Sequence, residues 1–173
     1  AGGKVDFVHI NSLIRSECNL MDYQILAIPG GFSYGDDIAS GKIVANELRY
    51  KLKSKVKTFL NEGNLIIGIC NGFQVLVKAG LLPDFASDGE DRWVYLKGQK
   101  PEIREQKCIW TKDLPEKIYL PVAHGEGKFT PKNKSILKRL YDENLVVFKY
   151  SGESEDKAGY PYNPNGSIDD IAG

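Results

Sequence analysis

Apolar residues in the first half of the chain form three short runs that predict β-strands. The first run spans 5–10, the second spans 23–28 and ends at Pro29-Gly30-Gly31, and the third spans 65–69. Glycine and proline directly after a β-prone run are typical of strand ends. The third run is continuous, which is typical of a parallel strand covered on both faces.

Between and after these strands, apolar residues recur at spacings of three and four, which predicts amphipathic helices. One helix is predicted over 42–62 and is closed by Gly63. The next follows Gly72. Their apolar stripes are Val44, Leu48, Leu52, Val56, Phe59 and Leu60 in the first, and Phe73, Leu76, Val77 and Leu81 in the second. Strand, helix, strand and helix in this order predict an α/β fold.

The second half has a different pattern, with short β-prone runs and few helical ones. Strands are predicted over 92–97, 103–110 and 118–122 without helices between them, so we expect a small antiparallel extension of a mostly parallel sheet.

One helix and one further strand complete the predicted elements. Thr130-Pro131 supplies an N-cap and a first-turn proline for a helix that carries Ile136 and Leu140. A strand is expected over 145–150, and the tail from 151 reads as irregular loop with a turn at Asn165-Gly166.

Length and composition favour one domain over 1–173 that handles a small polar metabolite or a protein partner. The 23 basic and 23 acidic side chains balance, which argues against nucleic acid or a membrane surface as ligand. The N-terminus lacks the layout of a signal peptide, so we expect a cytoplasmic protein. Three separated cysteines, Cys18, Cys70 and Cys108, indicate neither a disulfide framework nor a metal site.

Cys70 lies in the segment Gly68-Ile69-Cys70-Asn71-Gly72, which has the form of a nucleophile elbow between a strand and a helix. Such a turn strains the nucleophile's backbone, and flanking glycines remove Cβ atoms that would collide. The helix N-terminus favours the thiolate, and the N–H of Asn71 can receive an oxyanion. A small buried cysteine at a strand end is the alternative, which the context makes the weaker one. For Cys18 and Cys108 a structural role is the better interpretation.

Two further segments carry candidate chemistry. Successive glycines in 29–36 can present backbone N–H groups to an oxyanion beside the elbow, although an ordinary tight turn is equally compatible with them. His124 and Glu126, in Pro121-Val-Ala-His-Gly-Glu-Gly127, could be a base and its orienter or structural residues, and spacing alone leaves this open. His9, in the first predicted strand, is interpreted as structural.

Four blocks together resemble class I (triad) glutamine amidotransferases, and within them the glutaminase subunits of phosphoribosylformylglycinamidine synthases. The blocks are GICNGFQ (68–74), PGGFSYGDDIASGKI (29–43), PVAHGEGKF (121–129) and NPNGSIDDIAG (163–173), and the resemblance extends over essentially the whole chain. It implies a three-layer, flavodoxin-like α/β fold. It also implies that glutamine is hydrolysed to supply ammonia for the ATP-dependent conversion of formylglycinamide ribonucleotide to its amidine.

The resemblance implies a role for each matching residue. Cys70 would attack the glutamine amide to form a thioester, and backbone N–H groups of Gly31, Phe32 and Asn71 would form the oxyanion hole. The substrate-binding set would be Gln74, His124, Gly125 and Glu126, so that His124 is a substrate-loop residue and not the base.

In this family the catalytic His and Glu belong to a Pro-His-Pro-Glu motif that is not among these 173 residues, and a strand and helix precede the segment matching 1–10. The expected domain therefore lacks both parts, and we expect full activity from the complete protein only. A noncatalytic regulatory homologue and a cysteine hydrolase of related fold are the alternatives.

The resemblance also implies a large synthetase subunit as partner and L-glutamine as substrate, and it leaves a further small subunit open. No cofactor is expected in this subunit, because ATP and Mg²⁺ would be used by the synthetase. Loop 32–42 and the polar tail are the candidate docking surfaces.

Overall fold

The computed structural model describes most of the chain, namely residues 2–31, 41–83, 101–103, 108–120, 127–152, 158–164 and 166–173. The chain divides into two compact units, Ala1–Ser87 and Asp88–Gly173. The single domain expected over 1–173 stays a prediction. No helix in the described ranges is both long enough and apolar enough to cross a membrane.

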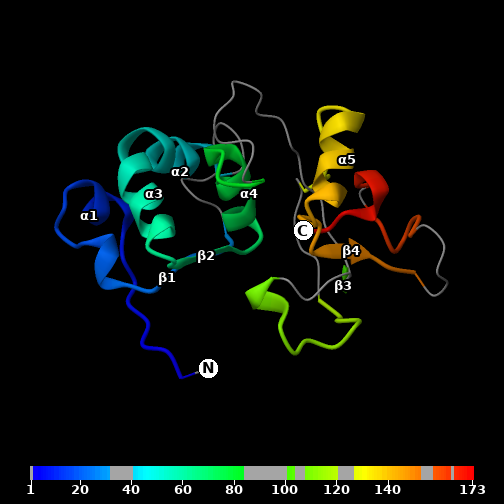
Figure 1. Cartoon of the computed structure of the whole chain (residues 1–173), viewed down its shortest axis with the longest axis horizontal. Coiled ribbons are helices and arrows are strands. Elements are labelled where there is room, and N and C mark those ends of the chain that lie inside the picture. The colour runs from blue at the N-terminus through cyan, green and yellow to red at the C-terminus, as the bar shows by residue number, and fades with distance from the viewer. Residues whose placement is uncertain are drawn as a thin grey trace. The chain divides into compact units, whose positions relative to one another are not determined.

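The first unit is built on two parallel strands, as the pattern predicted. Strand β1 (Ile25–Ile28) pairs with β2 (Leu65–Gly68) in a register that places Ile28 opposite Gly68. Helix α4 (Asn71–Ala79) follows β2 directly and ends at Gly80, whose φ of 77° is typical of a helix C-cap. The parallel pair and its helices confirm the α/β class (Figure 1).

The helix predicted over 42–62 is present but is divided into three consecutive pieces. These are α2 (Lys42–Asn46), a π-helical turn η3 (Glu47–Lys51) and α3 (Lys53–Asn61). Leu52 separates the last two with φ −114° and ψ 4°, and its N–H donates to the carbonyl of Glu47 at 3.1 Å. Leu52 is 1% exposed, so the break keeps an apolar side chain in the core.

The core of the first unit gathers side chains from all of its helices. Its buried members are Leu13, Leu20, Ala45, Leu48, Leu52, Val56, Phe59 and Val75. Most of the apolar residues predicted to line one face of the 42–62 helix therefore pack in the core. Leu60 is the exception in that predicted set, because it is 40% exposed.

The strand predicted over 5–10 is wrong. Residues 2–9 form no regular element, and the short helix α1 (Ile10–Ile14) starts at the end of the predicted strand. His9 is its N-cap, and its Nδ1 accepts the N–H of Asn11 at 3.2 Å. Phe7 is fully exposed. A β-prone run becomes a strand only when a neighbouring strand supplies hydrogen bonds, and none of the described strands pairs with this run. A 3-10 turn, η1 (Leu20–Asp22), lies between α1 and β1.

The second unit contains an antiparallel pair of strands, although not between the strands from which the extension was predicted. Strand β3 (Pro101–Ile103) pairs with β4 (Phe148–Tyr150). Helix α5 (Lys134–Asp142) precedes β4 in the chain. The prediction of a strand near 145–150 is confirmed for its second half.

Three local predictions in this unit are wrong or untested. Cys108–Thr111 carries a 3-10 turn, η5 (Ile109–Thr111), in place of a strand, because the hydroxyl of Thr111 donates to the carbonyl of Cys108 at 2.9 Å and closes the chain locally. Residues 118–120 form no strand, and 92–97 lie outside the described residues. Helix α5 is capped by Asn133 instead of Thr130, because the Asn133 side chain accepts the N–H of Ile136 at 2.9 Å.

The tail has more structure than its composition predicted. It contains the 3-10 turn η6 (Ile168–Asp170) and an antiparallel bridge between Lys149 and Ile171. Ile171 is 1% exposed. Of the predicted Asn165-Gly166 turn, Gly166 is described, with φ 65°, and Asn165 lies outside the described residues.

Candidate active site

Cys70 occupies the bend between β2 and α4 and has the strained backbone expected of an elbow. Its φ of 55° and ψ of −113° lie in a region that residues with a Cβ rarely adopt. The thiol is free and its residue is exposed to solvent. The structure thus has the geometry predicted from the sequence, while the catalytic role of the thiol stays a prediction.

The two glycines that flank the bend are required by close packing of backbone on backbone. A Cβ added to Gly72 would lie 1.9 Å from the carbonyl oxygen of Ile28 in the neighbouring strand. A Cβ added to Gly68 would lie 2.6 Å from the carbonyl oxygen of Gly72. Any side chain at either position would therefore push α4 away from the strands.

The glycine loop that follows β1 lies directly beside the elbow. A Cβ added to Gly30 would lie 3.1 Å from the Cβ of Cys70, and the next residue, Gly31, has φ 106°. This confirms that the crests of the two parallel strands meet at one edge of the sheet. Gly31 directly follows Gly30 in this loop, and Phe32 lies outside the described residues.

The start of α4 forms the other side of this crest. The N–H groups of Phe73 and Gln74 donate to the carbonyl of Cys70 at 3.0 and 3.3 Å. Asn71, the first helical residue, is 6% exposed, and Gln74 is half-buried. Amides in the first turn of a helix point out along its axis, which directs the N–H of Asn71 toward the bend.

Gly41 is a site residue that the sequence reasoning missed. It is the N-cap of α2 with φ 66°, and a Cβ there would lie 2.9 Å from Oδ1 of Asn71 and 2.5 Å from the side chain of Val75. The start of α2 is thus packed onto the start of α4. The available signal was a glycine directly before a periodic helical stretch.

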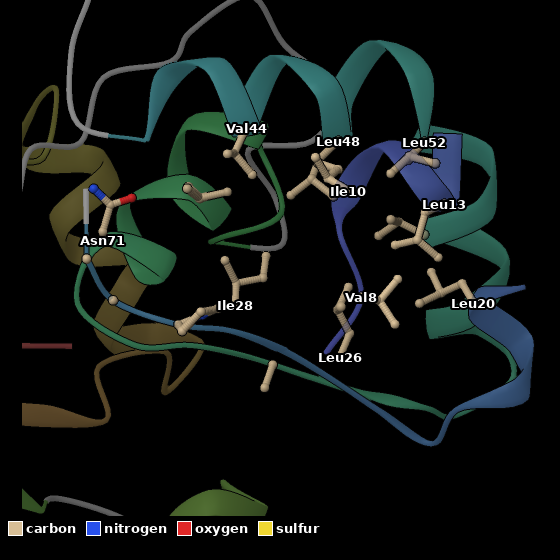
Figure 2. Close-up of a pocket in the computed structure, with 16 residues that line it drawn as sticks. Val8, Ile10, Leu13, Leu20, Leu26, Ile28, Val44, Leu48, Leu52 and Asn71 are labelled. Atoms are coloured by element: carbon tan, nitrogen blue, oxygen red, sulfur yellow. The ribbon is translucent and has the colours of Figure 1, made fainter. Parts of the chain in front are cut away.

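A cavity of about 380 Å³ opens behind the crest, between β1 and the helices α2 and η3 (Figure 2). Its lining is apolar apart from one end, where Gly30, Gly31 and Asn71 contribute. None of the described residues that line it is ionisable. Among the described residues, the groups at this crest with candidate chemistry are the Cys70 thiol and the surrounding backbone amides.

Of the remaining residues discussed as candidates, only some lie in the described part of the chain. His124, Gly125 and Glu126 lie outside the described residues. Cys18 packs against the core of the first unit, as its structural interpretation requires. Cys108 is half-buried and precedes η5. Within the described ranges no group of acidic, histidine or cysteine side chains could hold a metal ion.

Comparison with known proteins gives concordant results. The model of the CobB/CobQ-like glutamine amidotransferase domain family matches residues 1–173. The chain is 41% identical over 197 residues to phosphoribosylformylglycinamidine synthase subunit PurQ of Treponema denticola, covering 100% of this chain and 73% of that protein. It is 42% identical over 186 residues to the subunit of the same name from Dehalococcoides mccartyi, covering 100% and 69%.

A solved structure with a similar fold is that of PurLQS from Thermotoga maritima. The TM-score is 0.59 at 28% identity, and the match covers 90% of this chain and 64% of that chain. The chain thus spans a little less than two thirds of the solved chain.

Proposed function

Because the chain belongs to the CobB/CobQ-like glutamine amidotransferase domain family, we propose that it is the glutaminase subunit of a phosphoribosylformylglycinamidine synthase. The observation that carries this proposal is the strained Cys70 backbone, held between Gly68 and Gly72 and beside Gly30. The relatives from Treponema denticola and Dehalococcoides mccartyi, which are named as subunits of that synthase, support the substrate and the pathway.

In the proposed reaction the Sγ of Cys70 attacks the side-chain amide carbon of glutamine. Negative charge then develops on the amide oxygen, where backbone N–H groups of Gly31, Phe32 and Asn71 stabilise it. The C–N bond breaks, the leaving nitrogen takes up a proton as ammonia, and a glutamyl thioester remains. Water hydrolyses the thioester to glutamate and restores the thiol.

The proposed reaction also needs a general base to move these protons. His9, the histidine among the described residues, is engaged as the N-cap of α1, so we do not assign it this role. Gln74, His124, Gly125 and Glu126 are proposed to bind the glutamine, on the strength of the family resemblance.

Ammonia is protonated in water and diffuses away, so a glutaminase works best when it is docked to the enzyme that uses the product. We therefore propose a large synthetase subunit as partner, which uses ATP and Mg²⁺, and a cytoplasmic location. This subunit would need no cofactor of its own. Most of the proposed docking loop, 32–40, lies outside the described residues.

Replacement of the nucleophile tests the proposal. With the synthetase subunit present, Cys70→Ala should abolish synthesis from glutamine and leave synthesis from added ammonia intact. Cys108→Ala is the matched control and should retain both activities. Full glutamine-dependent synthesis by Cys70→Ala would refute the proposed function. Hydrolysis of other acyl compounds without any synthetase would instead favour an independent cysteine hydrolase.

A further inference from the structure

The proposed chemistry uses the backbone of Asn71 and leaves its side chain without a role. The backbone N–H is proposed to stabilise the oxyanion, whereas the side-chain amide is buried in the first unit. This amide belongs to the polar end of a cavity whose lining is otherwise apolar. Figure 2 shows it at one end of the cavity, below the start of α2. A polar side chain buried at such a position calls for an explanation.

The start of α2 leaves room for this amide. A Cβ added to Gly41, the N-cap of α2, would lie 2.9 Å from Oδ1 of Asn71 and 2.5 Å from Cγ2 of Val75. Asn71 and Val75 are one turn apart on α4, so they lie on the same face of that helix. Val75 is buried as well. The start of α2 is therefore packed on both side chains, and the amide occupies space that a side chain at position 41 would need.

The peptide group between Cys70 and Asn71 carries the proposed oxyanion donor and is held in a strained orientation. Cys70 has φ 55° and ψ −113°, and relaxation of this strain would rotate the peptide plane. The carbonyl of Cys70 accepts the N–H groups of Phe73 and Gln74 at 3.0 and 3.3 Å. These hydrogen bonds hold one end of the plane. The other end is the Cα of Asn71, to which the buried amide is attached.

Packing of the amide against Gly41 restricts this second end. A side chain enclosed by close-packed neighbours has little room to move, so it also holds the backbone atom that carries it. An oxyanion hole depends on donors that already point at the atom where charge develops. Rotation of the Cys70–Asn71 peptide would turn the N–H away from that atom, whereas the Cys70 side chain would keep its place beside Gly30.

We infer that Asn71 is a positioning residue through its side chain, which packs against Gly41 and so keeps the N–H of the Cys70–Asn71 peptide directed at the oxyanion. The inference rests on the proposed function, which assigns this N–H to the oxyanion hole. It adds a role for the side-chain amide and for Gly41, and neither of these donates to the oxyanion. All of the residues involved belong to the first unit.

The test is Asn71→Ala in the full-length protein together with its synthetase subunit. Alanine keeps the backbone N–H and removes the amide that packs against Gly41. Loss of a whole oxyanion donor costs about a hundredfold to a thousandfold in kcat, so a displaced donor should lower kcat for glutamine hydrolysis by at least about tenfold. KM for glutamine should change by less than about twofold, because the lost interaction is made only in the transition state. Ammonia-dependent synthesis should be unchanged.

Alkylation of Cys70 by iodoacetamide is a second measurement, and it needs no oxyanion hole. The thiolate displaces iodide and forms a C–S bond, so no charge develops on an oxygen atom. Mass spectrometry of the alkylated peptides separates Cys70 from Cys18 and Cys108. Because this rate depends on the thiolate and its access, the rate at Cys70 should stay within about twofold of the wild-type rate in Asn71→Ala.

Val75→Ala is the matched control, and it also provides the background for a second variant. It removes a buried side chain from the same face of α4 and leaves Asn71 against Gly41, so it should lower the melting temperature and retain kcat. Gly41→Ala added to Val75→Ala introduces a Cβ 2.9 Å from Oδ1 of Asn71 and so displaces the amide without changing Asn71 itself. This double variant should reproduce the loss of kcat relative to Val75→Ala.

The outcomes separate the inference from the proposed function. Unchanged kcat in Asn71→Ala, or equal losses in Asn71→Ala and Val75→Ala, would make the side chain merely structural and overturn the inference while the proposed function stands. An alkylation rate that falls in parallel with kcat would show that the thiol has moved, which also overturns it. If Asn71→Ala does not fold, the double variant decides by the same criteria. If the wild-type complex does not use glutamine, both the inference and the proposed function fail.

Discussion

Two of the turns that hold non-glycine residues at positive φ, the elbow at Cys70 and the tail turn at Asp169 and Asp170, do so by different means. At the elbow, Cys70 is fixed by backbone packed on backbone, with Gly68 and Gly72 allowing the approach. In the tail, Asp169 and Asp170 lie in a turn fixed by buried side-chain hydrogen bonds.

The difference matters for what each turn can do. At the elbow the Cys70 side chain makes no capping hydrogen bond, and Cys70 remains exposed, so its thiol is available for reaction. In the tail the polar atoms of Asn163 and Asp170 are engaged in holding the backbone. When packed backbone enforces the strain, the reactive side chain stays accessible. When hydrogen bonds enforce it, the polar side chains are occupied, and such a turn is suited to holding the backbone in place.

The largest effect is expected at the elbow, where packing of backbone on backbone enforces the strained conformation. Gly72→Ala introduces a Cβ that would lie 1.9 Å from the carbonyl oxygen of Ile28, so α4 must move away from β1. We expect the free energy of unfolding to fall by about 3 kcal/mol and glutamine-dependent activity to be lost. Urea denaturation followed by far-ultraviolet circular dichroism measures the first, and the synthase assay measures the second.

Gly63→Ala is the control for this prediction. Gly63 has φ 83°, but a Cβ there would meet no atom within 4 Å. It should therefore show only the cost of the backbone conformation, about 1 kcal/mol, with activity retained. Equal losses in the two variants would mean that backbone conformation, and not close packing, makes glycine necessary at position 72.

The second largest effect is expected in the tail, where side-chain hydrogen bonds hold the turn. Asn163→Ala leaves the backbone groups of Ser167 and the carboxylate of Asp170 without their partner in a buried site. We expect a loss of about 2 kcal/mol in the free energy of unfolding. Both tryptophans, Trp93 and Trp110, belong to the second unit, so tryptophan fluorescence reports its unfolding. A change below a few tenths of a kcal/mol would show that the hydrogen bonds of Asn163 do not hold the turn.

The third prediction concerns replacement of the strained residue by glycine at each turn. Glycine adopts positive φ freely, so Cys70→Gly should be about 1 kcal/mol more stable than Cys70→Ala, although both lack the nucleophile. Asp169→Gly should gain nothing, because it also loses the contacts of Asp169 with Tyr141 and Lys149. Urea titrations of the three variants and the wild type measure this. A stabilised Asp169→Gly would contradict the distinction between the two turns.

The elbow could be predicted from the sequence because its determinants are local. Glycines two positions to either side of Cys70, a strand before it and a helix after it are all visible within one short stretch. The proximity of Gly30 followed from a general rule for parallel strands. Gly41 was missed because its contact with Asn71 joins elements 30 positions apart in the sequence.

The tail could not be predicted, because its order depends on distant partners. Asn, Asp, Ser and Gly favour turns locally, and nothing near Ser167 announces a bond to Phe129. The failed strand at 5–10 illustrates the converse: its residues favour strands, yet His9 caps a helix there. Local signals thus succeed where the restraint is steric and local, and they fail where hydrogen-bond partners come from elsewhere.

The smallest expected effect concerns pH and the second unit. Tyr150, at the end of β4, is 3% exposed, and burial raises the pKa of its hydroxyl above the ordinary value. Because the folded state disfavours the ionised hydroxyl, the neutral Tyr150 contributes to the free energy of unfolding. This contribution is complete below about pH 10 and is lost as the pH rises toward the higher pKa of the folded state. Tryptophan fluorescence during urea unfolding should show declining stability above about pH 10.

A control variant is needed to assign this decline to Tyr150, because a second tyrosine has a pKa shifted in the same direction. Partial burial and nearby Asp6 also raise the pKa of Tyr23 in the first unit. Tyr150→Phe has no hydroxyl to ionise, so it should flatten the alkaline decline that tryptophan fluorescence records for the second unit. An unchanged decline in this variant would show that another group is responsible.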